Sequence, residues 1–157
     1  MIDSTAIVSK QTKIGNNVQI GAYSIIHDNV TIGENTIIGA YCEIGITTGL
    51  AKNSSLLIGA NSVIRSKAVI YIGSDIGAEL VTGHDITIRE NSKIGNAVQL
   101  GNRTDVQGDC IVGNYTKMHA DVHIGKMSKI GNYCWLFPEV LLTNDPTPPS
   151  NDLFGVT

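Results

Sequence analysis

Aliphatic residues recur at every sixth position along most of the chain. A period of six fits neither an α-helix, which repeats after about 3.6 residues, nor the two-residue alternation of a simple strand. A second aliphatic series is two positions out of phase with the first, and only Thr82 interrupts it. The first series is Ile2, Val8, Ile14, Ile20, Ile26, Ile32, Ile38 and Ile44, and the second runs from Ile58 to Leu142.

Small or β-branched residues precede most of these aliphatic positions by two, as at Val18, Ser24, Thr36 and Cys42. Residues two apart lie on one side of a strand, so each hexad is interpreted as a short strand followed by a corner. Gly or Asn in the corner permits the positive φ that tight turns need. Such a hexapeptide repeat is typical of a parallel β-helix, whose rungs pair through their backbones and bury the aliphatic residues in a central stack.

Composition excludes several classes of protein. The 157 residues favour one domain, and the formal net charge of -3 is spread without a basic stripe, so we expect no nucleic-acid partner. No stretch approaches the roughly 18 apolar residues of a membrane span, and the start has no basic and apolar leader, so we expect a soluble, cytoplasmic protein without a membrane partner. Cys42, Cys110 and Cys134 lack paired spacing and are interpreted as core residues.

The repeat is interrupted at both ends of its second series. The phase shift falls in "ITTGLAKNSSLL", residues 46–57, which is either a surface loop or a rim for substrate or subunit contact. Proline cannot join a strand ladder, so we expect a β-helix domain over 1–145 and a proline-rich loop over 146–157. That loop leads toward a missing or truncated rung: either the chain is truncated there or another chain covers the end. The prolines are Pro138, Pro146, Pro148 and Pro149.

Repeats such as Ile14-Gly15-Asn16-Asn17-Val18-Gln19 and Ile94-Gly95-Asn96-Ala97-Val98-Gln99 resemble the left-handed β-helix family of hexapeptide acyltransferases. The resemblance covers roughly residues 2–145. It implies an all-β, left-handed parallel β-helix in which three hexads make one triangular coil, so that residues eighteen apart are stacked. It also implies a homotrimer, with coenzyme A bound along the prism edge between neighbouring subunits.

Two segments resemble functional motifs of such enzymes. Thr82-Gly83-His84, followed by Ile88-Arg89-Glu90, is similar to the T-G-H and I-R-E segments of acyltransferases related to sugar-modifying acetyltransferases. Leu142-Thr143-Asn144-Asp145, followed by Pro148-Pro149, is similar to the T-N-D-x-x-P loop of acetyltransferases that act on amino sugars, often nucleotide-linked ones. Stacking by eighteen places Asn144 over Lys126, Gly108 and Glu90, so that Glu90, Asn144 and Asp145 are expected to share a cleft. The alternatives are a solvated surface histidine and an ordinary Asx-Pro turn.

These residues suit acyl transfer from a thioester, which needs an acceptor amine or hydroxyl, a base and donors for the oxyanion. Because imidazole titrates near neutral pH, His84 is the candidate base. Glu90, Asn144 and Asp145 are predicted to orient it or to bind the acceptor, and the N–H of Gly101 is a candidate oxyanion donor. No G-x-S-x-G motif occurs, so direct attack by the acceptor is favoured.

The resemblance supplies acetyl-CoA as the donor, and we assign Lys126 and Trp135 to its binding. The acceptor is an amino sugar, a sugar hydroxyl or a nucleotide-linked form of either. Trp135 and Phe137 flank the inward Leu136, so both are expected to face outward as a contact surface or the wall of a groove.

Two other functions stay open. His84, His119 and His123 invite comparison with a zinc site of the γ-carbonic-anhydrase kind. His84 and His119 are 35 residues apart, one short of two coils, so they are out of register, and we expect no metal. A non-catalytic trimeric scaffold is the other alternative.

Overall fold

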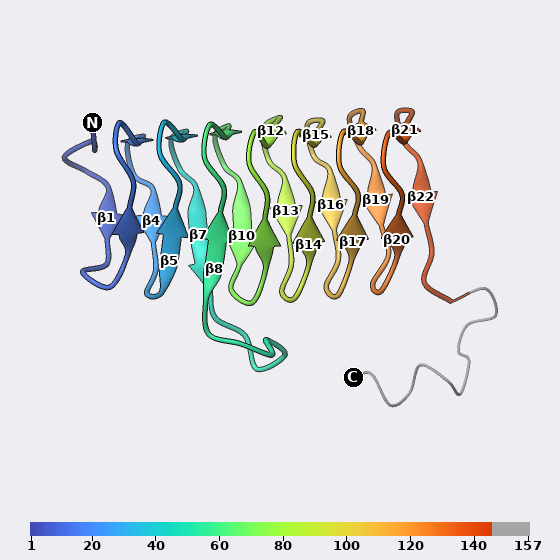
Figure 1. Cartoon of the computed structure of the whole chain (residues 1–157), viewed down its shortest axis with the longest axis horizontal. Helices are drawn as coiled ribbons and strands as arrows, with labels where there is room; N and C mark the ends of the chain where they lie inside the picture. Colours follow the sequence, from blue (N-terminus) through green and yellow to red (C-terminus); the bar gives the residue numbers. More distant parts are fainter. Residues whose placement is uncertain (146–157) are drawn as a thin grey trace.

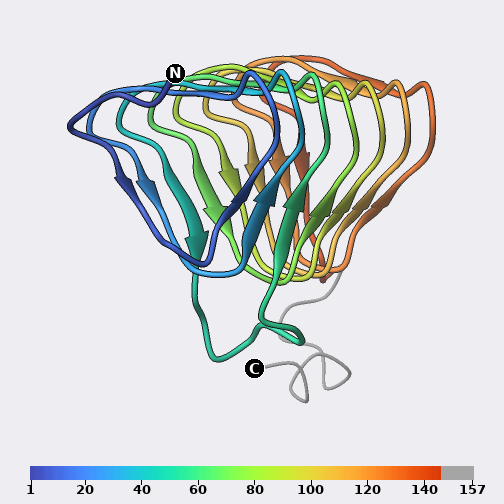
Figure 2. The same cartoon turned by 60° about the vertical axis from the view of Figure 1, so that its left-hand side comes forward.

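The structure is a computed structural model that describes residues 1–145, in which short parallel strands wind into a triangular prism (Figure 1). Each coil contributes one strand to each of three sheets, and the coils follow one another along the prism axis from the N-terminus (Figure 2). The predicted left-handed parallel β-helix is confirmed. The predicted loop over 146–157 lies outside the described residues. Within the described range, no helix has the length and apolar character needed to cross a membrane.

We number the sheets in chain order. Sheet 1 consists of β1 (Ile7–Val8), β4 (Ile25–Ile26), β7 (Glu43–Ile46), β10 (Val69–Tyr71), β13 (Thr87–Ile88), β16 (Asp105–Val106), β19 (His123–Ile124) and β22 (Leu141–Leu142). Sheet 2 consists of β2 (Lys13–Ile14), β5 (Val30–Ile32), β8 (Leu56–Ile58), β11 (Asp75–Ile76), β14 (Lys93–Ile94), β17 (Ile111–Val112) and β20 (Lys129–Ile130). Sheet 3 consists of β3 (Gln19–Ile20), β6 (Ile37–Ile38), β9 (Val63–Ile64), β12 (Val81–Thr82), β15 (Gln99–Leu100), β18 (Lys117–Met118) and β21 (Trp135–Leu136).

The register of the sheets follows the repeat. Thr87 pairs with Asp105 and Asp105 pairs with His123, so residues eighteen apart are stacked as expected. Edge 1 comprises the corners that follow sheet 1, edge 2 those that follow sheet 2 and edge 3 those that follow sheet 3. A residue's position in the repeat therefore gives both its face or edge and its neighbours above and below.

The predicted aliphatic stack forms the core. Ile44, Ile70 and Ile88 are completely buried, and each such side chain contributes about 1.5–3 kcal/mol relative to an exposed one. The small polar residues also point inward, and their hydroxyl groups donate to corner carbonyls, which satisfies them inside an apolar core. Examples are Ser24 to Gly39 (2.8 Å), Ser92 to Gln107 (3.2 Å) and Thr116 to Gly131 (2.8 Å).

Two of the three cysteines belong to this core. Cys42 and Cys110 are buried, as predicted, and Cys134 is half-buried. Burial raises the pKa of the Cys42 and Cys110 thiols, because the charged thiolate would lose its hydration.

The corners differ from the expectation in one respect. Positive φ falls on the third corner residue and is adopted by Asn17, Tyr41, Arg103 and many other residues with side chains, whereas among the glycines of residues 1–145 only Gly45 and Gly73 adopt it. At most corner glycines, the backbone of the neighbouring coil instead lies too close to leave room for a side chain. A Cβ on Gly101, for example, would lie 2.3 Å from the carbonyl carbon of His119. The explanation of glycine by positive φ is therefore wrong for most corners.

The loop between β7 and β8 projects from the prism (Figure 1) and shifts the register, since Thr31 pairs with Leu57 rather than with Gly49. It is attached to edge 1. The N–H of Lys52 donates to Asn91 Oδ1 at 2.8 Å, and Asn91 Nδ2 donates to the carbonyl of Leu50 at 2.9 Å. The ammonium of Lys52 pairs with Asp109. The loop therefore folds over corners that come two and three coils after its own.

Candidate functional site

The structure distributes the predicted site residues over two edges of the prism. His84 lies on edge 3, and Trp135, in β21, lies on the adjoining sheet 3. Glu90, Lys126 and Asn144 follow strands of sheet 1, so they lie on edge 1 together with Asp145. Within one chain, sheet 1 separates His84 from the edge 1 residues.

The corner that carries His84 is fixed by the one polar member of the aliphatic series. Thr82 is buried, and its hydroxyl accepts from the N–H of Arg65 at 2.9 Å and donates to the carbonyl of Gly83 at 2.9 Å. The backbone N–H of His84 donates to Asn102 Oδ1 at 2.8 Å. The imidazole itself is exposed, as the sequence predicts. Thr82 therefore satisfies its own hydroxyl while helping to hold the backbone from which His84 projects.

A surface groove of about 490 Å³ lies over sheet 3 beside this corner. Gly83 and Gly101, which have no side chains, line it together with Arg65, Lys117 and His119 among others. His84 is not one of the lining residues, whereas Trp135 is. The groove thus offers cationic and imidazole groups next to the His84 corner.

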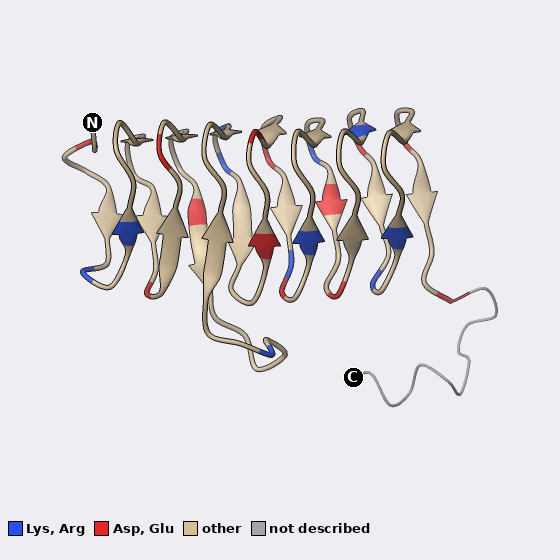
Figure 3. Ribbon diagram, in the orientation of Figure 1, with Lys and Arg blue, Asp and Glu red and all other residues tan. Residues whose placement is uncertain are grey.

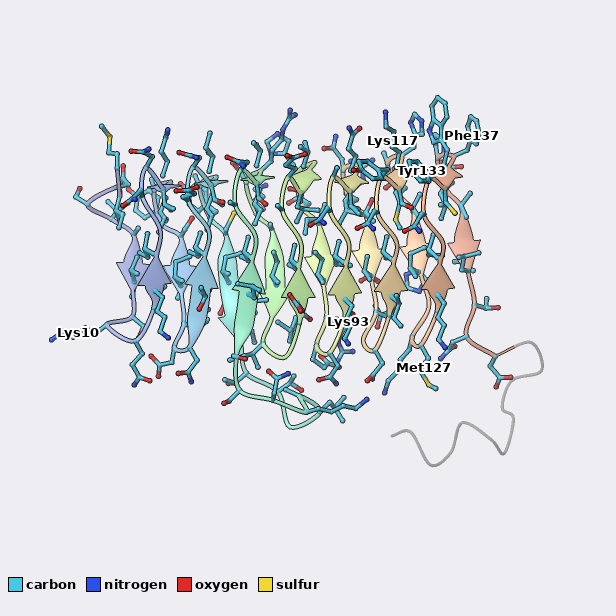
Figure 4. The ribbon with its side chains drawn as sticks, viewed as in Figure 1. Lys10, Lys93, Lys117, Met127, Tyr133 and Phe137 are labelled. Atoms are coloured by element: carbon cyan, nitrogen blue, oxygen red, sulfur yellow. The ribbon has the colours of Figure 1, made fainter. Side chains whose placement is uncertain are left out.

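Aromatic rings form one wall of this groove. The ring of His119 stacks on that of Trp135, with centroids 5.8 Å apart, and Trp135 stacks on Phe137 at 5.6 Å. Trp135 and Phe137 are each about three-fifths exposed, which confirms that both face outward. Figure 4 shows Lys117 and Phe137 on the same side of the coils. Stacked exposed rings of this kind present a large, flat apolar surface.

One predicted donor is already used. The N–H of Gly101 donates to the carbonyl of Met118 at 2.8 Å as part of the rung pairing. The assignment of this N–H to an oxyanion is therefore wrong, because the hydrogen bonds that stack the coils consume it.

Glu90 is almost completely buried on edge 1. Arg89 binds its carboxylate through two contacts, Nη2 to Oε1 at 3.0 Å and Nε to Oε2 at 3.2 Å. Gly108 gives the carboxylate its space, because a Cβ there would lie 2.8 Å from Glu90 Oε1. Three rungs of about 4.8 Å each separate Glu90 from the exposed Asn144. Glu90 thus stabilises its corner, and a contact between Glu90 and substrate stays a prediction.

The other edge 1 residues surround Asp109. Lys52 binds one of its carboxylate oxygens, and Lys126 Nζ lies 4.0 Å from the other. Asn144 stacks over the preceding coil at Gly125, where a Cβ would lie 2.9 Å from the Asn144 nitrogen. Figure 3 shows charged residues at corners of this edge and on strands of sheet 2, and also at the corners on the opposite side of the prism. Edge 1 is therefore polar and largely filled, and Lys126 there contacts a carboxylate.

The sequence analysis missed a polar group on the outward face of sheet 1. His123 Nδ1 lies 3.0 Å from Asp105 Oδ2, and Gln107 Nε2 donates to the same oxygen at 2.6 Å. The signal was present, because Asp105 and His123 are eighteen residues apart at outward positions. Stacking by eighteen, applied to this pair, would have placed them side by side.

The histidines considered for zinc are not gathered in one chain. His119 lies over Gly101 and His84 over Asn102, so the two occupy adjacent columns of edge 3. No group of three or more His, Cys, Asp or Glu residues with the spacing of a metal site occurs within residues 1–145.

Known proteins share this pattern. Residues 11–45 match the family model described as bacterial transferase hexapeptide (six repeats). The chain is 32% identical over 133 residues to the acyl-[acyl-carrier-protein]–UDP-N-acetylglucosamine O-acyltransferase of Thermodesulfovibrio yellowstonii, an alignment that covers 83% of this chain and 48% of the relative. It is 31% identical over 154 residues to the bifunctional protein GlmU of Herminiimonas arsenicoxydans, covering 83% of this chain and 33% of the relative.

One solved structure that is similar to this chain is also that of an acyltransferase. The UDP-N-acetylglucosamine acyltransferase of Francisella novicida superimposes with a TM-score of 0.66 at 26% identity, covering 90% of this chain and 62% of that one. The chain spans half the length or less of the curated relatives it matches. The fold and repeat define a parallel β-helix protein of the hexapeptide class. The chain shares the hexapeptide repeat with these proteins, and its similarity is to acyltransferases that carry the repeat.

Proposed function

We propose that the protein is an acyltransferase that moves an acetyl group from acetyl-CoA to an amine or hydroxyl of a sugar, including nucleotide-linked amino sugars. The observation that carries this proposal is the groove over sheet 3, which has an aromatic and imidazole wall and lies next to the exposed His84. The similarity to acyltransferases whose names specify UDP-N-acetylglucosamine supports a sugar acceptor.

His84 is the proposed base. Its imidazole projects from a corner fixed by Thr82 and Asn102, so it can accept the proton of the attacking amine or hydroxyl without a change of backbone. Direct attack on the thioester then gives the acylated acceptor and free thiol. Trp135 provides a ring surface in the groove for the pantetheine or the sugar.

The resemblance to hexapeptide acyltransferases implies a homotrimer, and we propose that the site lies between copies. Sheet 1 separates His84 from Asn144 in one chain, so both can contact a single substrate only if different copies contribute them. Lys126 and Asp145 lie on the same edge as Asn144, and we assign Lys126 to the donor and Asp145 to the acceptor.

The donor has a close chemical alternative. The Thermodesulfovibrio relative is named for an acyl-carrier protein, whose acyl group is also carried as a thioester. Purified protein is therefore supplied with acetyl-CoA in one series and with acyl-carrier protein charged with short and long acyl chains in another. Each donor is combined with UDP-, GDP- and dTDP-linked amino sugars, and the released thiol is measured.

We expect thiol release that requires both a donor and a sugar acceptor. His84→Gln should lower kcat about 100-fold to 10,000-fold, since this is the range that general bases contribute. His27→Gln is the matched control, because His27 pairs with Glu43 on edge 1 near the N-terminal end of the prism. Absence of acceptor-dependent thiol release in the wild type would contradict acyl transfer, and full activity of His84→Gln would contradict only the assignment of the base.

A further inference from the structure

The outward face of sheet 1 carries a histidine whose orientation is set by its neighbours. His123 and Asp105 begin adjacent strands, and the register places them side by side. Nδ1 of His123 lies 3.0 Å from Asp105 Oδ2. An ionised carboxylate can only accept hydrogen bonds, so Nδ1 carries the proton in this contact. Nε2, on the opposite side of the ring, is directed away from the carboxylate.

Asp105 is held in turn by Gln107. Gln107 Nε2 donates to Asp105 Oδ2 at 2.6 Å, and both residues point outward from the same rung. The side chains of His123 and Asp105 are about one-third exposed. Partial burial strengthens the attraction between an imidazolium and a carboxylate while leaving the ring open to a ligand. Enzymes fix a proton-accepting histidine in this way: a carboxylate holds the imidazole, and a further hydrogen bond holds the carboxylate.

The other three histidines of the chain lack this arrangement. His27 contacts Glu43 through Nε2 rather than Nδ1. His119 stacks on Trp135. No side chain within residues 1–145 forms a hydrogen bond with the ring of His84. Among the contacts within residues 1–145, His123 is the histidine with a carboxylate on Nδ1.

The position of the pair relates it to the predicted site. β19 leads directly into the corner of edge 1 over which Asn144 stacks. The next residue after the inward Ile124 is Gly125, so no side chain intervenes there between His123 and the edge. The pair therefore lies on the same part of the molecule as the Thr143-Asn144-Asp145 segment.

We propose that His123 is a proton-transfer residue of the acyl transfer and that Asp105 is its positioning residue. This inference rests on the proposed activity but does not require His84 to be the base. As the acceptor nitrogen or oxygen bonds to the carbonyl carbon of the thioester, Nε2 of His123 takes the proton of that N–H or O–H. The C–S bond then breaks, and the imidazolium, stabilised by Asp105, gives the proton to the departing thiolate.

The test compares kcat and KM for acyl transfer in the wild type, His123→Gln, Asp105→Asn and the control His27→Gln. We expect His123→Gln to lower kcat at least about 100-fold, and Asp105→Asn about tenfold or more, with KM changed less than about threefold. The control should match the wild type. Unfolding of each variant by denaturant is measured alongside, so that loss of folded protein is not taken for loss of catalysis.

A spectroscopic measurement tests positioning separately. Nitrogen NMR of labelled histidine should show His123 protonated at Nδ1 when its ring is neutral, and a mixture of tautomers in Asp105→Asn. A purely structural role for Asp105 would leave kcat of the folded variant unchanged. Protonation of the neutral ring at Nε2 in the wild type would overturn the proposal.

The outcomes separate this inference from the proposed function. If the wild type transfers no acyl group, the proposed function fails and this inference falls with it. If the wild type is active and His123→Gln retains about a third of kcat or more, well short of a general base's contribution, only this inference is overturned. Loss of activity in both His84→Gln and His123→Gln would support a site to which both imidazoles contribute.

Discussion

The corners of edge 1 and edge 3 are built from the same six-residue repeat but carry different side chains. On edge 1, Arg89, Glu90 and Asp109 fill the corners with paired charges, and the loop over 46–57 folds onto them. On edge 3, Gly83 and Gly101 have no side chains and line a groove together with the ring of His119. The difference shows that the repeat fixes the position of each corner, whereas the residues that do not repeat decide whether it is closed or open to a ligand.

The largest expected difference between the edges concerns buried charge. Arg89→Ala removes the partner of the buried Glu90 carboxylate and should lower the free energy of unfolding by about 3 kcal/mol. Arg103→Ala is the matched control on edge 3, where Arg103 forms a two-point contact with Asp121 and lowers the pKa of that exposed carboxyl. The unfolding midpoint of Arg103→Ala should not change. Equal effects of the two variants in denaturant titrations would contradict the difference between the edges.

A smaller effect is expected from filling the floor of the edge 3 groove. Gly101→Ala places a Cβ against the backbone of His119, so the two rungs must separate, at a cost of about 1–3 kcal/mol. Gly49→Ala is the control, because no atom lies within 4 Å of a Cβ at that loop position. Thermal unfolding distinguishes the two. If Gly101→Ala is as stable as the wild type, close approach of the backbone is not what this corner requires.

The smallest effect on stability should come from the aromatic wall. Trp135→Ala removes an exposed ring, so the unfolding midpoint should stay within a degree or two, while KM for donor or acceptor should rise about tenfold through loss of ring stacking. Tyr133→Ala, which removes an exposed ring from a stacked pair on edge 2, is the control and should leave KM unchanged. A fall in kcat without a change in KM would place Trp135 outside the binding surface.

The sequence predicts the fold closely because a single rule governs every rung. The aliphatic series determines which side chains point inward, and stacking by eighteen then fixes the register of the three sheets except across the loop over 46–57, where Thr31 pairs with Leu57. The break at Thr82 was visible in the sequence. Its cause was not, because the Thr82 hydroxyl accepts a hydrogen bond from the N–H of Arg65 in the preceding coil.

The candidate site is less predictable because its contacts depend on single neighbours. Burial of Glu90 follows from the absence of a side chain at Gly108, one coil later, which the repeat alone does not specify. The contact of Lys52 with Asp109 joins residues 57 apart through a loop outside the repeat. The pair of Asp105 with His123, by contrast, follows the period and could have been found by comparing outward residues in each column.

The central claim is that edge 1 and edge 3 of different copies form one site, and mixing of variants tests it most directly. His84→Gln and Asn144→Ala, each impaired alone, are produced together in the same cells and assayed for acyl transfer at low acceptor concentration. If neighbouring copies in a trimer contribute the two residues, random assembly leaves about a quarter of the sites intact, so about a quarter of wild-type activity should return. Mixed protein no more active than the two variants assayed separately would contradict a shared site.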